Sequence, residues 1–167
     1  IRRSLFWLLD YYPEIETSNS GSMLNAIEHC CVAESIGFSS VWCAEHHFQT
    51  LGTIPNPSVF LAAVSQKTNT LRLGPAISVL PLHNPIQVAE DYAMVDLVSG
   101  GRLNMGVGTG SQPLESQGMG KVYENRIEDF NHNLSELIRR WEAASEGHGG
   151  IEAVNVTPIQ KPSPPLY

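Results

Sequence analysis

The chain has 167 residues, of which 42% are hydrophobic and 16% are charged, and this composition suits one globular domain with a sizeable core. Its formal net charge is −7, which disfavours nucleic acid and anionic membrane surfaces as partners. No apolar run approaches the roughly 18 residues that a membrane-spanning helix needs, so we expect no membrane association. The three cysteines do not suggest a disulfide framework, and we expect reduced thiols in a cytoplasmic protein.

Two buried strands and two helices are expected in the first half of the chain. Residues 4–9 and 40–44 are apolar runs of the kind that form strands covered on both faces. Between these runs, apolar side chains recur at helical spacing from Met23, and Gly37 lies where a helix end favours a positive φ. The pair Asn56-Pro57 then predicts a helix start, because Asn caps helices and Pro suits the first helical position.

The second half of the chain continues this alternation. Residues 71–79 and 102–107 are expected strands, and the pair Asn84-Pro85 between them predicts another helix start. A polar loop should follow Gly110, before a helix whose apolar stripe we expect to pack on the outer face of the sheet. The stripe comprises Ile127, Phe130, Leu134, Leu137, Ile138 and Trp141, and the residues expected in the contact are Phe130, Leu134, Leu137 and Trp141. The last two residues would begin a fifth strand.

This alternation of strands and helices predicts a parallel α/β sheet with right-handed crossovers. Two architectures fit it: a doubly wound open sheet, or a (β/α)8 TIM barrel of which about four βα units, the N-terminal half, are present. In both, chemistry gathers beyond the carboxyl ends of the strands. The residues at those ends include Asp10, Glu45, His46, His47, Ala76, Ser78, Gly108 and Thr109. A histidine at that edge can move protons near neutral pH, although histidines that only hold a loop would give the same pattern.

The glycines at 106, 108 and 110 lack the spacing of a dinucleotide-binding loop. We expect them instead to let a planar ligand or a neighbouring strand approach the backbone. No group of residues has the spacing of a metal site or of a nucleophile–base pair. The histidines outside the strand ends are therefore expected to be helix-surface or loop residues; they are His29, His83, His132 and His148.

Several consecutive segments, which together span nearly the whole chain, resemble the bacterial luciferase-like family of flavin-dependent monooxygenases. They are residues 33–48, 73–85, 89–92, 96–103 and 158–162. The resemblance implies the barrel rather than the open sheet. It also implies a single luciferase-like domain over residues 1–167 that is truncated at the start of its fifth strand, because a complete barrel needs about 250 residues.

The resemblance further implies a cofactor and partners. Members of this family bind reduced flavin mononucleotide (FMN) and use O2 to oxidise a small organic molecule, with a flavin reductase as the electron source. A branch of the superfamily uses the deazaflavin F420 instead, and the segment 45–48 is more similar to the FMN branch. An FMN-dependent monooxygenase, with a homodimer as one assembly, is therefore expected. Two alternatives stay open: an F420-dependent oxidoreductase and a non-catalytic flavin-binding half barrel.

The same resemblance assigns roles to the residues at the strand ends. His46 matches the catalytic histidine, His47 and Asp10 are expected on the substrate side, and the cofactor side is expected to comprise Glu45, Ala76, Ser78, Gly108 and Thr109. Ala76 matches the residue that follows a non-proline cis peptide bond, which places that bond between Pro75 and Ala76. Thr109 stands where bacterial luciferase has an arginine that pairs with the flavin phosphate, so the phosphate would receive a hydrogen bond but no charge.

Overall fold

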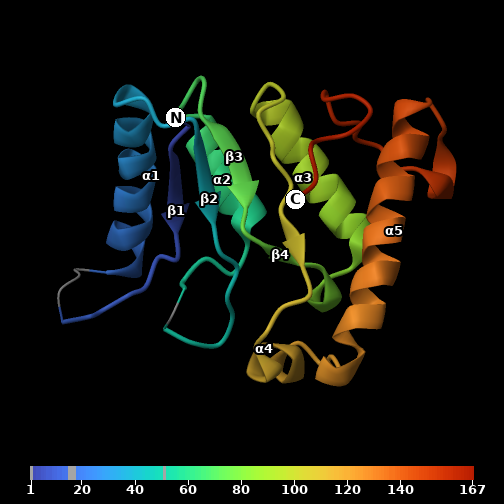
Figure 1. Ribbon diagram of the computed structural model, residues 1–167, viewed down its shortest axis with the longest axis horizontal. Helices are drawn as coiled ribbons and strands as arrows, with labels where there is room; N and C mark the ends of the chain where they lie inside the picture. Colours follow the sequence, from blue (N-terminus) through green and yellow to red (C-terminus); the bar gives the residue numbers. More distant parts are fainter. Residues whose placement is uncertain (1, 15–17, 51) are drawn as a thin grey trace.

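The computed structural model describes residues 2–14, 18–50 and 52–167. Parallel strands form the central layer, and helices flank it (Figure 1). The strands are β1 (Ser4–Trp7), β2 (Ser40–Cys43), β3 (Arg72–Pro75), β4 (Ser78–Val79) and β5 (Val107–Gly108). The α-helices are α1 (Asn19–Ser35), α2 (Pro57–Ser65), α3 (Pro85–Val98), α4 (Pro113–Gly118) and α5 (Arg126–Ser145). Three short 3-10 helices are η1 (Leu80–Leu82), η2 (Tyr123–Asn125) and η3 (Gly150–Glu152).

The strands lie side by side in the order of the chain. β1 pairs with β2 and β2 with β3, and β4 pairs with β5. Single bridges extend the layer from Leu73 to Leu103 and from Met105 to Leu166. All these pairings are parallel, as the sequence predicts. A doubly wound sheet requires a reversal of strand order, and the described residues contain none.

The third and fourth predicted strands differ from the observed ones. The run 71–79 divides into β3 and β4 at a cis peptide bond between Ala76 and Ile77. The prediction of a cis bond between Pro75 and Ala76 is therefore wrong by one residue. The Ala76 N–H still donates to the Cys43 carbonyl at 2.7 Å, so the regular β2–β3 pairing reaches Ala76 and the break comes after it. In the run 102–107, only Val107 belongs to a strand, β5, while Leu103 and Met105 each form an isolated bridge.

Helix ends follow local capping chemistry. The Asn56 and Asn84 side chains accept backbone N–H bonds at the starts of α2 and α3, which confirms both predicted starts. Gly37 has a φ of 86° after α1, as a helix end of this kind requires. The start of α1 lies four residues earlier than Met23, because Ser18 accepts a bond from the Gly21 N–H at 3.0 Å and caps the helix there.

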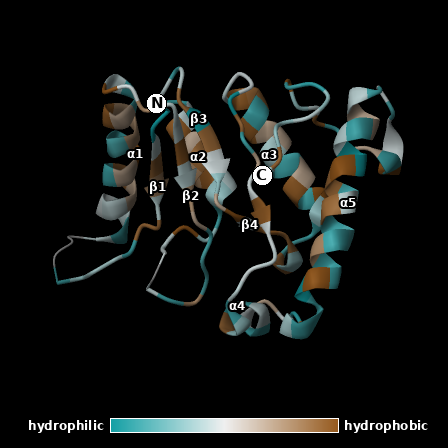
Figure 2. Cartoon of the chain, in the orientation of Figure 1, coloured by the Kyte–Doolittle hydropathy of each residue, from teal (hydrophilic) through white to brown (hydrophobic). Residues whose placement is uncertain are grey.

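Helix α5 is held by contacts with α3 and η1. Leu137 and Trp141 are fully buried, and the Trp141 indole N–H donates to the Ala89 carbonyl of α3 at 2.9 Å. Asn133 similarly donates to the Leu80 carbonyl of η1. The described contacts that hold α5 are thus with α3 and η1, while Leu137 and Trp141 belong to the same buried core as the strand residues Val41 and Leu73. Figure 2 shows the alternation of hydrophobic and hydrophilic residues along α5, and Ile127 at its start is 58% exposed.

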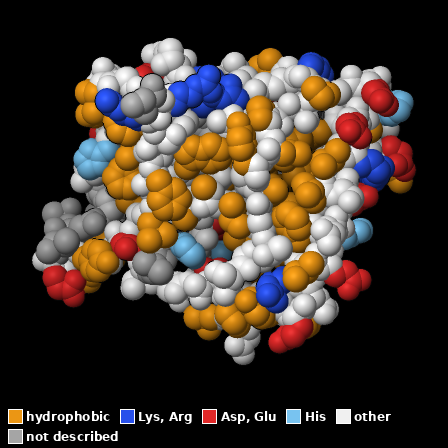
Figure 3. Space-filling view, in the orientation of Figure 1, with side chains coloured by type: hydrophobic (Ala, Val, Ile, Leu, Met, Phe, Trp, Pro, Cys, Tyr) orange, Lys and Arg blue, Asp and Glu red, His pale blue; other side chains and the backbone are white. Residues whose placement is uncertain are grey.

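The face of the strand layer opposite α2 and α3 carries apolar side chains that nothing in the described residues covers. Figure 3 shows hydrophobic side chains gathered across this face. Phe6 is 54% exposed and Tyr167 is 67% exposed, and the Trp42 ring packs edge-on against Tyr167. None of the described helices is long and apolar enough to cross a lipid bilayer.

Candidate functional site

The carboxyl ends of the strands bring the predicted residues to one edge of the sheet. Asp10 follows β1, the segment 45–47 follows β2, Ala76 follows β3 and Thr109 follows β5. Asp10 lies beneath the loop after β2, because its Oδ1 accepts the Gly52 N–H at 2.7 Å. Gly52, at a φ of 75°, packs so closely on His46 that a Cβ there would lie 2.5 Å from the ring. Asp10 thus helps to hold the loop that packs against His46.

His46 forms a buried pair with a residue that the sequence did not indicate. Its Nδ1 lies 2.9 Å from Oε1 of Glu115, which is on α4 and 3% exposed. The same oxygen accepts the His47 backbone N–H at 3.0 Å and the Gln49 side-chain N–H at 3.3 Å. One carboxylate oxygen therefore binds His46, His47 and Gln49, all in the segment that follows β2.

This arrangement selects the tautomer of His46. An ionised carboxylate only accepts hydrogen bonds, so Nδ1 of His46 carries the proton and donates it to Glu115. The other ring nitrogen, Nε2, is then left free to accept or donate a proton. Because the His46 side chain is 19% exposed while its partner carboxylate is buried, the ring is held from one side and reachable from the other. Such a carboxylate–histidine pair also stabilises an imidazolium when one forms.

His47 contacts a different set of groups, as the alternation of side chains along a strand predicts. Its Nε2 lies 3.0 Å from Oε1 of Glu45, and Nε2 of His83 lies 2.6 Å from the same oxygen. The second oxygen of Glu45 accepts the Val79 N–H at 3.1 Å. Glu45 is 3% exposed, so these bonds satisfy a carboxylate inside the protein rather than one at the surface.

The pKa values in this cluster shift as a buried ion pair requires. Burial raises the pKa of the Glu45 carboxyl, but the bonds from His47 and His83 outweigh burial and leave that pKa below its usual value. Burial lowers the pKa of His83, and the bond to Glu45 together with its negative charge raises it overall. Burial, followed by the charge of Glu45, raises the pKa of Tyr92 well above normal. Glu45 is therefore held as an anion.

The glycines after the predicted fourth strand permit close packing of two strands. A Cβ on Gly106 would lie 2.2 Å from the Pro75 carbonyl oxygen, and one on Gly108 would lie 2.0 Å from the Ile77 side chain. These glycines therefore let a neighbouring strand approach, which was one of the two expected reasons for them. Thr109 is half-buried, and its hydroxyl donates a hydrogen bond to the carbonyl of the next residue, Gly110, at 3.4 Å.

The remaining predicted cofactor residues differ in accessibility. Ala76 is half-buried at the edge of the sheet. Ser78 is 2% exposed, and its hydroxyl lies next to Tyr92 in the interior. Ala76 thus lies where a ligand could reach it, whereas Ser78 supports the layer behind.

Sequence reasoning missed two residues of this site, Glu115 and His83. The region after Gly110 was expected to be a polar loop, but α4 forms there and carries Glu115. Pro113 at the first position of a helix was the available signal. His83 was expected to be an ordinary loop residue, and its bond to Glu45 corrects that expectation. Its position directly after η1 brings it back over the segment that follows β2.

Comparison with known proteins identifies the family. Residues 6–167 match the family model described as luciferase-like monooxygenase. The chain belongs to this family. The resemblance seen in the sequence is thereby confirmed, and family membership supports an oxidoreductase.

Relatives and solved structures agree with this assignment. The chain is 30% identical to the oxygenase component of flavin-dependent trigonelline monooxygenase from Acinetobacter baylyi, with 84% of this chain and 41% of that protein covered. The crystal structure of monooxygenase RslO1 from Streptomyces bottropensis superposes with a TM-score of 0.90 at 24% identity, over 99% of this chain and 52% of that one. The chain therefore spans about half the length of these relatives.

Two other solved structures differ in their cofactor. The oxygenating constituent of 3,6-diketocamphane monooxygenase from Pseudomonas putida, in complex with FMN, gives a TM-score of 0.79 at 22% identity, over 96% of this chain and 44% of that one. An F420-dependent secondary alcohol dehydrogenase, in complex with an F420–acetone adduct, gives a TM-score of 0.76 at 21% identity, over 99% and 51%. At these identities the likeness establishes a shared α/β fold and leaves the choice between the two cofactors open.

Proposed function

We propose that residues 1–167 form one domain, the first four βα units of a (β/α)8 barrel, within a monooxygenase that uses reduced FMN and O2. The chain-order arrangement of parallel strands supports the barrel. The uncovered apolar face of the strand layer supports it too, because the interior of a barrel is filled by side chains from all of its strands. The observation that carries the catalytic part of the proposal is the His46–Glu115 pair at the carboxyl edge of the sheet.

The residues at this edge fit the ring of a flavin better than its phosphate. Ala76 and Ile77 are half-buried, and so are Val107, Gly108 and Thr109, so a strip of backbone is open to a planar ligand. Thr109 can donate one hydrogen bond from its hydroxyl. Among these residues none is positively charged, so we place the ring here and assign the phosphate no charged partner from this strip.

His46 is the residue that handles protons in this proposal. Bound reduced flavin supplies the electrons that activate O2. Nε2 of His46 is the free ring nitrogen. When the ring is protonated at both nitrogens, Nε2 donates its proton to an oxygen that gains negative charge, which leaves the ring neutral, and Nε2 later recovers a proton. Glu115 keeps Nδ1 protonated throughout and stabilises the positive charge that the ring carries before it donates. Acid–base help of this kind contributes about 10²–10⁴ in rate.

The other predicted residues take supporting places. Gly108 and Thr109 lie on the cofactor side, and the hydrogen bond between Glu45 and His47 fixes the position of the His47 ring. His47 and Asp10 remain candidates for the substrate side of the edge. A separate flavin reductase is the expected electron source, since the trigonelline enzyme is named as an oxygenase component.

A second candidate function is F420-dependent oxidation, which the fold of the secondary alcohol dehydrogenase supports. In that case Nε2 of His46 would serve substrate oxidation without O2. A non-catalytic flavin-binding role is the third candidate. The three candidates differ in which cofactor binds and in whether O2 is consumed.

The test is an anaerobic titration of the whole protein with reduced FMN and, separately, with reduced F420. The FMN complex is then mixed with O2 while flavin reoxidation and hydrogen peroxide are measured. We expect binding of reduced FMN and, with a panel of aldehydes, ketones and sulfur compounds, an oxygenated product. Binding of F420 alone would contradict the FMN assignment, and binding of FMN without any reaction with O2 would contradict an oxygenase.

The role of His46 is tested with His46→Ala in the same assay. We expect retained FMN binding, with the oxygen reaction diverted from product to hydrogen peroxide. His29→Ala, on the exposed surface of α1, serves as the matched control and should behave like the wild type. Unchanged product formation by His46→Ala would remove this residue from the mechanism, and loss of FMN binding alone would make it a cofactor contact.

A further inference from the structure

The cluster of Glu45, His47 and His83 has a composition that hydrogen bonding alone does not require. Two imidazole Nε2 atoms and one carboxylate oxygen lie within 4.8 Å of one another. These residues come from the end of β2 and from the segment after η1, so their meeting is a product of the fold. We propose that Glu45, His47 and His83 form a binding site for a divalent transition-metal ion such as Zn²⁺.

The donor set selects the class of ion. Two histidines with one carboxylate are a ligand set for catalytic zinc and for ferrous iron. Imidazole nitrogens favour Zn²⁺, Cu²⁺, Ni²⁺ and Fe²⁺, whereas Mg²⁺ and Ca²⁺ prefer oxygen ligands. The site is therefore distinct in chemistry from one that would bind a phosphate-associated magnesium ion.

The distances from the two histidine nitrogens to the carboxylate oxygen are close to those around such an ion, and all three ligand atoms lie within 4.8 Å of one another. Ligands about 2.1 Å from a metal lie about 3.0–3.5 Å apart. The His47 Nε2 to Glu45 Oε1 distance of 3.0 Å already meets this requirement. The His83 Nε2 to Glu45 Oε1 distance is 2.6 Å, so His83 must move by about half an ångström to admit the ion. Rotation of the partly exposed His83 ring can supply such a movement.

The surroundings hold the carboxylate in place and leave room for a fourth ligand. The second oxygen of Glu45 accepts the Val79 N–H, an outer bond of the kind that orients metal ligands. A small cavity lies against Glu45 and His83, and Ser78, Asp91 and Tyr92 complete part of its lining. Zinc sites with three protein ligands take water as the fourth, and this polar cavity can hold that water.

The charges also favour a cation at this position. Glu45 is buried, with a side chain that is 1% exposed, and Asp91 lines the adjacent cavity. Two neutral imidazoles contribute no charge, so a divalent ion would meet two carboxylates nearby. To bind the ion, each imidazole must present an unprotonated Nε2, and the metal therefore competes with protons at these two atoms.

The test begins with the purified protein, stripped of metal with EDTA and then titrated with Co²⁺. We expect one equivalent to bind and to produce the intense visible bands of four- or five-coordinate Co²⁺. Added Zn²⁺ should bleach these bands by displacing the cobalt, and Zn²⁺ should also raise the Tm of the stripped protein. The absence of visible bands, or only the weak bands of six-coordinate cobalt, would overturn the proposal.

Variants then locate the bound ion. His83→Gln keeps an N–H donor for Glu45 but removes a metal ligand, so the affinity for Co²⁺ should fall by about 100-fold or more, beyond the 10–100-fold expected for an outer partner. His47→Gln should have the same effect, so the conclusion does not depend on the correct folding of a single variant. Circular dichroism confirms the fold of each. Cobalt binding that survives both substitutions would overturn the proposal.

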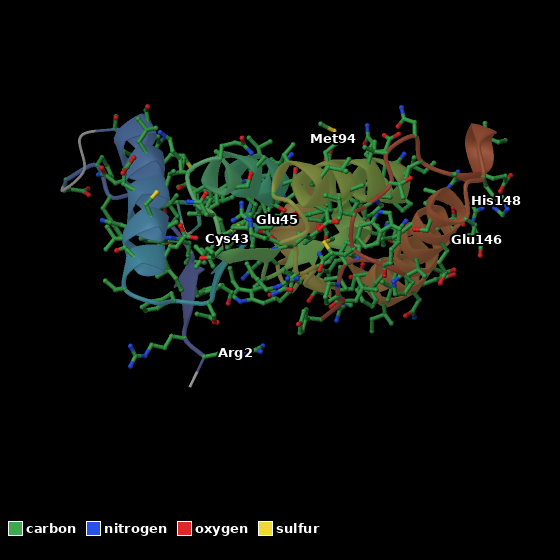
Figure 4. The ribbon with its side chains drawn as sticks, turned by 90° about the horizontal axis from the view of Figure 1, so that it is seen from above. Arg2, Cys43, Glu45, Met94, Glu146 and His148 are labelled. Atoms are coloured by element: carbon green, nitrogen blue, oxygen red, sulfur yellow. The ribbon has the colours of Figure 1, made fainter. Side chains whose placement is uncertain are left out.

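A surface histidine provides the matched control. His148 lies near Glu146 in the exposed segment that follows α5, with His148 Nδ1 3.6 Å from the carboxylate, while Figure 4 shows Glu45 far away in the middle of the molecule. His148→Gln should leave Co²⁺ affinity and the visible bands unchanged. Equal loss of binding in His148→Gln and His83→Gln would mean nonspecific binding at surface histidines and would overturn the proposal. The readout is metal binding, so its failure is separate from failure of the flavin function.

Discussion

Replacement of Glu115 by Gln tests whether this residue acts through His46. Gln has nearly the same shape and can offer its amide oxygen to the same donors, so the substitution removes mainly the negative charge. Hydrogen bonds to a charged group contribute about 1.5–3 kcal/mol and neutral ones about 0.5–1.5 kcal/mol, a difference of about 1 kcal/mol for each bond. The bonds from His46 and the His47 N–H, at 2.9 and 3.0 Å, are the two shortest. We therefore expect Glu115→Gln to lower the free energy of unfolding by about 2 kcal/mol.

The effect on catalysis should be of similar size. When His46 carries a positive charge, the carboxylate of Glu115 stabilises it. Loss of about 1–2 kcal/mol at that step corresponds to a fall of about 5- to 30-fold in its rate. Urea denaturation measures the stability change, and stopped-flow reoxidation of reduced FMN measures the rate. Glu142→Gln, on the exposed face of α5, is the control and should change stability by less than about 0.5 kcal/mol.

A double-mutant cycle decides the mechanism. If Glu115 acts through His46, then Glu115→Gln should cause no further loss of rate in a protein that already carries His46→Ala. An equal loss in both backgrounds would refute the reasoning, because it would show that Glu115 acts independently of the histidine. A stability loss with an unchanged oxidation rate would refute it too, since Glu115 would then hold only the loop after β2.

Three further predictions concern stability. Leu137→Ala, in the buried contact of α5, should lower the free energy of unfolding by about 2–5 kcal/mol, as measured by urea denaturation. Ile127→Ala, at the exposed start of this helix, should lower it by less than about 0.5 kcal/mol. Equal losses would contradict the packing of α5 on α3. Gly106→Ala places a Cβ against the Pro75 carbonyl and should cost about 1–3 kcal/mol, and an unchanged Tm would contradict that close approach. Burial raises the pKa of the Glu34 carboxyl, but hydrogen bonds from Thr70 and Leu71 outweigh burial and leave that pKa below its usual value. The ionised Glu34 therefore stabilises the fold at pH values above the ordinary carboxyl pKa, and this stabilisation is lost as the pH falls through the lowered pKa. The wild type should therefore lose more stability than Glu34→Gln between about pH 6 and about pH 3, and parallel losses would refute this.

The sequence by itself determined the parallel α/β arrangement and most of the helix ends. Caps such as Asn56 and Asn84 act on amides within three residues, so their effect is readable from neighbouring letters. Buried strands in a parallel sheet are apolar on both faces, which makes β2 recognisable as a continuous run. The position of His46 at the end of β2 follows from the same local pattern, and its resemblance to the family's histidine came from consecutive residues.

Only the tertiary structure decided which groups meet at the edge of the sheet. Glu115 is 69 positions from His46, and His83 is 38 positions from Glu45. The start of α1 after its cap Ser18 and the break after Ala76 also escaped sequence reasoning, because each depends on a single side chain or peptide bond rather than on periodicity. Periodicity tells which face of a segment is buried, but not which distant segment covers it. The folded positions of α4 and η1 supply these partners, since they bring the Glu115 carboxylate to His46 and the His83 imidazole to Glu45 within hydrogen-bonding distance.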